Sequence, residues 1–136
     1  MTEKEILSKI QSYNFYTVVK KELEGQLESL VCKITTEYGD ASGVTGGNYE
    51  SKVEKIAIKR DRVKSKIHAI DLLLQEIKDL IEHSGLDQLE QEILWRVAKC
   101  ESLISYARNK KIYKSTVYKI RDRAIKRIYN KIQNVV

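Results

Sequence analysis

Apolar residues recur every three or four positions along most of this chain, and the sequence contains no proline to interrupt them. Such spacing places one face of an α-helix toward a core, whereas a β-strand would alternate apolar and polar residues. No alternating segment bounded by turn residues is present in the sequence. The pattern therefore predicts an all-α fold.

One segment breaks this helical periodicity. Gly39, Gly43, Gly46 and Gly47 lie within nine residues, among Thr, Ser, Asp and Asn side chains. Ordering so many glycines costs backbone entropy, so a helix is not expected there. We predict a loop over 35–48, and its glycine spacing does not match a phosphate-binding loop.

Helices are predicted on both sides of this loop, at about 3–11, 14–34 and 48–83. Thr2 and Glu5 have the spacing of a capping box at the start of the first helix, and Gly85 ends the third. Two long amphipathic helices joined by a loop form an antiparallel hairpin. We therefore expect a domain over 1–86 that oligomerises or binds a partner. The C-terminal helices or a second copy, in a homodimer, would cover its broad apolar face.

Charge is distributed unevenly between the two halves of the chain. Residues 1–86 contain 13 Lys/Arg and 14 Asp/Glu, a net −1, whereas residues 87–136 contain 12 and 5, a net +7. A basic rear half is expected to meet a polyanion such as DNA. The absence of an apolar signal segment and of a long apolar run predicts a cytoplasmic protein with no membrane contact.

Neither a metal site nor an active site is predicted. Cys32 and Cys100 have no CxxC partner and are expected to be small buried apolar residues, and neither histidine lies in a Cys/His cluster. Glu90 and Glu92 are two positions apart, on different faces of a helix, so they do not form an acid–base pair. We therefore expect no enzyme activity, no cofactor and no small-molecule substrate.

The rear of the chain predicts three further helices, at about 87–99, 102–111 and 114–132. Ala107 is small enough for two helices to cross closely, and Ile112 is an apolar plug in the turn between them. Polar residues occupy 114–116, ahead of Val117, which would be buried. This order of small, plugging, polar and buried residues is what a helix-turn-helix needs in order to enter a DNA groove.

The segment YARNKKIYKSTVYKIRDRAIKRI resembles the helix-turn-helix of sigma factor region 4. In that pattern Tyr106 and Ala107 take the usual Ile-Ala pair, and Ala124 takes the small residue before the closing aliphatic residues. The sequence departs from the pattern at Lys111, usually glycine, and at Tyr113, usually a Ser or Thr helix cap. A lysine in a left-handed turn costs about 1 kcal/mol relative to glycine.

Nearly the whole chain resembles the small late-gene transcriptional activators of phages that infect Gram-positive bacteria, the RinA/ArpU/LtrC-like regulators. The resemblance implies that 87–136 binds promoter DNA and, with host RNA polymerase in the bacterial cytoplasm, switches on late genes. It implies base contacts from Lys114, Ser115, Thr116, Tyr118 and Lys119. It implies phosphate contacts from Arg108, Lys110, Lys111, Arg121, Arg123, Lys126 and Arg127.

The expected partners are therefore double-stranded DNA, RNA polymerase and a possible second copy of the chain. Two other functions remain open. A small terminase subunit for DNA packaging also joins a helix-turn-helix to a helical oligomerisation region. A protein-interaction module that inhibits a related activator would have no DNA contact.

Overall fold

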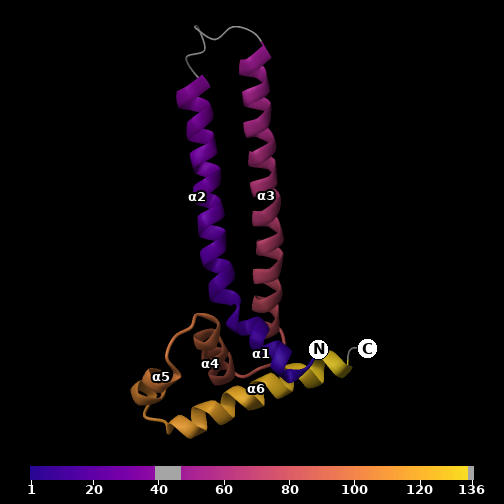
Figure 1. Ribbon diagram of the computed structural model, residues 1–136. Coiled ribbons are helices and arrows are strands. Elements are labelled where there is room, and N and C mark those ends of the chain that lie inside the picture. The colour runs from indigo at the N-terminus through magenta and orange to yellow at the C-terminus, as the bar shows by residue number, and fades with distance from the viewer. Residues whose placement is uncertain (39–46, 135–136) are drawn as a thin grey trace. The chain divides into compact units, whose positions relative to one another are not determined.

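The computed structural model describes residues 1–38 and 47–134, with side chains described for 1–31 and 53–134. Within these residues the chain is helical and contains no strand, which confirms the predicted all-α class. The helices, labelled in Figure 1, are α1 (Glu3–Gln11), α2 (Tyr13–Tyr38), α3 (Gly47–Glu82), α4 (Gln88–Ala98), α5 (Leu103–Lys110) and α6 (Lys114–Asn134). No helix in this described part combines the length and apolarity needed to cross a membrane.

The chain divides into two compact units. Unit 1 comprises Met1–Tyr16 and Leu73–Val136, and unit 2 comprises Thr17–Leu72. This division differs from the expected boundary at residue 86, because α1 and the end of α3 pack with the C-terminal helices. Four isoleucines of these two helices are fully buried in the same apolar cluster as α4, α5 and α6: Ile6, Ile10, Ile77 and Ile81.

Side-chain caps fix three helix starts in unit 1. The Thr2 hydroxyl accepts a hydrogen bond from the Glu5 N–H at 3.2 Å, at the predicted start of α1. At α4, the Asp87 carboxylate accepts from the Glu90 N–H at 2.9 Å, and the Glu90 carboxylate accepts from the Asp87 N–H at 3.3 Å. Ser102 caps α5 through its hydroxyl. Each such cap typically stabilises a helix by about 1 kcal/mol.

Helix α4 ends in a turn that places Cys100 in the left-handed region, with φ 56°. The Glu101 N–H donates to the Arg96 carbonyl at 2.8 Å, and the Cys100 N–H donates to the Val97 carbonyl at 3.1 Å. These are the two hydrogen bonds of a Schellman motif. Cys100 is exposed, so its predicted burial is wrong, because the residue lies in the turn that leaves α4 and not on the apolar face of that helix. Cys32 lies outside the described side chains.

Unit 2 contains α2 from Thr17 and α3 as far as Leu72, and these two segments run antiparallel (Figure 1). An ion pair joins them, with Lys20 Nζ 2.6 Å from Asp71 Oδ1. The buried apolar residues among the described side chains of this unit are Leu23, Ile56 and Val63.

The loop predicted over 35–48 falls mainly on 39–46, which lies outside the described residues. The two ends of the predicted range are helical, because α2 extends to Tyr38 and α3 begins at Gly47. At its other end α3 stops shortly before Gly85, whose φ of 74° is the left-handed conformation that glycine adopts without strain.

Candidate nucleic-acid interface

A left-handed turn at Lys111 connects α5 to α6. Its φ of 56° and ψ of 41° are the values predicted for the glycine position of the turn, although the residue is a lysine. The Ile112 N–H donates to the Ala107 carbonyl at 2.9 Å and the Lys111 N–H donates to the Arg108 carbonyl at 3.3 Å, which again is a Schellman motif. Ala107 is buried and Ile112 packs against the same core, so both hydrogen bonds and apolar contacts hold this turn.

Helix α6 begins immediately after this turn and presents its leading end to solvent. Lys114, Ser115, Thr116 and Lys119 are all exposed. Val117 is fully buried and fixes the opposite side of the same helical turn in the core, as predicted. The Thr116 and Val117 N–H groups both donate to the Tyr113 carbonyl, at 3.0 and 3.2 Å. The side chain at the usual Ser/Thr cap position, Tyr113, is 84% exposed.

Tyr118 differs from the other four residues for which base contacts are predicted. Its side chain is half-buried and packs against the core. The Arg121 guanidinium lies over its ring, 5.0 Å from the ring centroid, in a cation–π contact. Arg121 also donates from Nε and Nη2 to Asp122 Oδ1, at 3.1 and 3.0 Å. Both side chains would therefore have to break contacts within the protein before reaching DNA.

Two further arginines of α6 bind a carboxylate of α4. Glu90 is fully buried, and its Oε1 accepts a hydrogen bond from Arg127 Nη1 at 2.7 Å. Arg123 Nε lies 3.6 Å from Glu90 Oε2, and Arg123 Nη2 lies 3.9 Å from Asp87 Oδ2. We call Asp87, Glu90, Arg123 and Arg127 the carboxylate clasp. A buried charge is costly unless it is paired, so the clasp ties α6 to the start of α4.

The clasp also changes the acidity of the Asp87 carboxyl. The hydrogen bond that it accepts from the Glu90 N–H lowers its pKa most, and the nearby Arg123 and Arg127 charges act in the same direction. The lowered pKa favours the ionised form of Asp87, which is the form that caps α4 and attracts the two arginines.

The remaining residues for which phosphate contacts are predicted lie free on the surface of unit 1. These exposed cations are Arg108, Lys110, Lys111 and Lys126. Within the described part of the chain, none of them forms an ion pair. Arg123 and Arg127 keep about half of their side-chain surface exposed, at 52% and 49%, so a phosphate would share them with Glu90. The structure thus separates the predicted set into free cations and cations with internal partners.

Sequence reasoning missed the roles of Glu90 and Glu92. It considered the two acids only as a catalytic pair, yet each binds its own partner: Glu90 the clasp arginines, and Glu92 the Tyr106 hydroxyl, which donates to Oε2 at 2.8 Å. A signal for Glu90 was present, because an Asp followed three residues later by Glu is a capping box. No local signal gives the link from Glu90 to Arg127, since it joins residues 37 positions apart.

Among the described residues no group of three or more His, Cys, Asp or Glu side chains is arranged to hold a metal ion. We found no significant match to this chain among protein-family models, curated proteins or solved structures. The functional interpretation therefore depends on the geometry and charge of α5, the Lys111 turn and α6.

Proposed function

We propose that this chain binds double-stranded DNA through α5, the Lys111 turn and α6, as a transcriptional activator of the phage late-gene type. The observation that supports this most is the leading end of α6. Four polar side chains project there into solvent, from Lys114, Ser115, Thr116 and Lys119, while Val117 holds the same helical turn in the core. A recognition helix needs this combination of an accessible leading end and a fixed rear face.

The exposed residues suit the edges of base pairs in the major groove. The Lys114 and Lys119 ammonium groups can donate to the guanine O6 and N7 acceptors, and the Ser115 and Thr116 hydroxyls can donate to or accept from several edges. Arg108, as one of the free cations beside the turn, would contact phosphates, which sets the register without selecting a sequence.

Activation would follow from binding to DNA and to host RNA polymerase at the same time. A few kcal/mol of favourable contact between activator and polymerase raises promoter occupancy by a large factor, because each 1.4 kcal/mol is tenfold. This step, and the bacterial cytoplasm as its location, belong to the proposal through the resemblance to phage activators.

The first test is salt-dependent binding to a labelled DNA duplex, measured by fluorescence anisotropy. Each phosphate contact steepens the dependence of log K on log salt, by about 0.9 per contact. Arg108→Gln, at a proposed phosphate contact, should weaken binding several-fold and reduce this slope by up to about 1. Lys119→Gln, at a proposed base contact, should also weaken binding several-fold. Point substitutions are preferable to deleting α6, because five residues of that helix are buried in the core.

Lys64→Gln is the matched control, because Lys64 is also exposed but belongs to α3 in unit 2. It removes the same charge from outside the proposed interface, so it should leave the slope almost unchanged. Equal losses for Lys64→Gln and Lys119→Gln would show only a general attraction between a basic protein and DNA, and would contradict the proposed interface.

Selection from a random duplex pool, followed by a reporter carrying the selected site, tests regulation. We expect Ser115→Ala and Thr116→Ala to relax the selected sequence and to lower reporter transcription. Ring-sized oligomers that bind DNA without changing transcription would favour a packaging protein instead. No DNA binding at low salt would favour the interaction module.

A further inference from the structure

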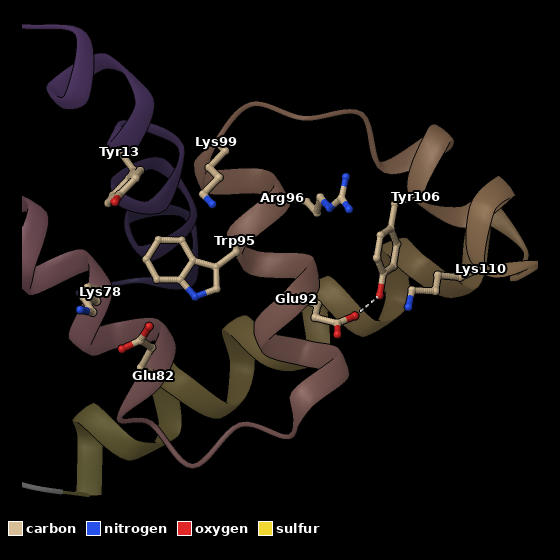
Figure 2. A pocket seen from close by; sticks show the side chains of 9 residues that line it. All are labelled: Tyr13, Lys78, Glu82, Glu92, Trp95, Arg96, Lys99, Tyr106 and Lys110. Carbon is tan, nitrogen blue, oxygen red and sulfur yellow. Dashed lines mark hydrogen bonds between the residues drawn. The ribbon is translucent and has the colours of Figure 1, made fainter. Parts of the chain in front are cut away.

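A pocket of about 650 Å³ opens on unit 1, and it is distinct from the leading end of α6. Helix α4 supplies Glu92, Trp95 and Arg96, and Lys99 follows directly after it. The start of α2, the end of α3 and helix α5 supply the rest of the wall (Figure 2). The residues around it are aromatic or charged. We infer that this pocket binds an acidic segment of a partner protein, with an apolar side chain of that segment packed against Trp95.

The aromatic wall of the pocket is already fixed in place. Trp95 is half-buried and meets Tyr13 edge to face, with 5.3 Å between ring centroids. On the other side of the pocket, the Tyr106 hydroxyl donates to Glu92 at 2.8 Å, as Figure 2 shows. A partner would therefore meet a wall that loses little side-chain freedom on binding, which favours affinity. Partly exposed tryptophans are also frequent anchors in protein interfaces.

The charges of the pocket favour an anionic occupant. It contains four cations and two acids, and one of those acids, Glu92, is engaged by Tyr106. Among the described residues, the ammonium groups of Lys78, Lys99 and Lys110 pair with no carboxylate, and Lys99 lies over the Trp95 ring, 5.8 Å from its centroid. Arg96 differs from them, because it binds Glu101 at 2.7 Å. Three cations thus remain available to a partner.

A protein segment fits these features better than a nucleic acid does. A phosphodiester chain carries one charge at every nucleotide, so it would bring phosphates close to the Glu82 and Glu92 carboxylates that also line the pocket. An acidic peptide can instead place separate carboxylates at Lys78 and Lys99 and turn an aliphatic or aromatic side chain toward the indole.

The test uses the full chain and the fluorescence of Trp95, which is its single tryptophan. The probe is a short synthetic peptide of Asp and Glu residues with one central Phe, titrated at low salt. We expect a saturable change in Trp95 emission. A peptide with Asn and Gln in place of the acids, and another with Ala in place of Phe, should each bind several-fold more weakly.

Lys78→Gln combined with Lys99→Gln should weaken binding of the acidic peptide by about tenfold, from two lost ion pairs at a partly desolvated rim. Both lysines are exposed, so folding should be unchanged, which circular dichroism can verify. Neither is among the residues proposed to contact DNA, so duplex binding should also be unchanged. Lys119→Gln should give the opposite result, with weaker duplex binding and unchanged peptide binding.

Three outcomes would overturn the inference. The first is no emission change with the acidic peptide. The second is an equal loss of peptide binding from the Lys64→Gln control in unit 2. The third is a Trp95 response to single-stranded oligothymidylate that exceeds the response to the peptide, which would assign the pocket to nucleic acid.

Discussion

The two units bury very different amounts of apolar side chain. In unit 1, 17 buried residues form one continuous cluster, to which every helix except α2 contributes a buried residue. In the described part of unit 2, only Leu23, Ile56 and Val63 are buried, and Ile58 and Leu72 are more than half exposed. Two helices can cover only one strip of each other, whereas helices packed at several angles enclose a core. Unit 1 therefore has the packing needed to hold α6 in a fixed orientation against α4 and α5.

The largest expected difference between the units comes from truncating a buried isoleucine in each. Ile128→Ala in α6 should lower the free energy of unfolding by about 2–5 kcal/mol, because the cavity would lie in a closely packed cluster. Ile56→Ala in α3 should cost less, because a two-helix unit can close around the missing atoms. Urea unfolding combined with hydrogen exchange in each unit measures both values. Equal costs would mean that unit 2 is as closely packed as unit 1.

A second comparison concerns a hydrogen bond and an ion pair that each join two helices. Tyr106→Phe in unit 1 removes the hydrogen bond to Glu92 and should cost about 1 kcal/mol. Asp71→Asn in unit 2 weakens the ion pair with Lys20, which is partly exposed, so its cost should stay below about 1 kcal/mol. Urea unfolding at neutral pH gives both numbers, and Tyr113→Phe, at an exposed tyrosine, is the neutral control.

The stability that the Tyr106–Glu92 hydrogen bond contributes should also depend on pH. Burial, helped by the hydrogen bond to Glu92, raises the pKa of Tyr106 from 10.0 to about 12. Because the neutral hydroxyl is the donor, its contribution to stability is complete below about pH 10 and declines as the pH rises toward 12. The difference in stability between the native chain and Tyr106→Phe should therefore shrink over this range. A constant difference would contradict the assigned hydrogen bond.

The smallest effects concern glycine, and the stabilising substitution is to glycine in unit 1 but away from glycine in unit 2. Lys111→Gly should stabilise unit 1 by up to about 1 kcal/mol, because φ is 56° at this position. Gly25→Ala should stabilise unit 2 by a similar amount, because Gly25 lies within α2 and an added Cβ would meet nothing within 4 Å. Thermal unfolding of both variants tests this, with Lys110→Gly in α5 as a variant expected to destabilise.

The sequence predicted local features better than distant ones. The helix starts at Thr2 and Lys114 and the left-handed turn at Lys111 follow from residue types within a few positions, and the structure has them where they were expected. The division into units could not be predicted, because the apolar face of α1 is the same whichever helix covers it. Likewise, the contact between Arg127 and Glu90 could not be predicted, because the two residues are 37 positions apart in the sequence.

In the candidate interface, too, local features could be predicted from the sequence, whereas contacts between distant residues could not. Exposure of Lys114, Ser115, Thr116 and Lys119 follows from helical spacing around the buried Val117, and it agrees with the sequence prediction. Tyr118 was predicted to contact bases together with these four residues, but its side chain is half-buried and the Arg121 guanidinium lies over its ring. The pocket around Trp95 could not be predicted from the sequence, because it forms only where distant segments meet. These segments are parts of α2 and α3 together with α4 and α5.

Helix α6 keeps its core contacts and its proposed DNA contacts on separate side chains. Val117, Ile120 and Ala124 belong to the core, whereas Lys114, Ser115, Thr116 and Lys119 are exposed. If these four residues contact base pairs as proposed, substitutions at them would change the preferred DNA sequence at little cost in stability.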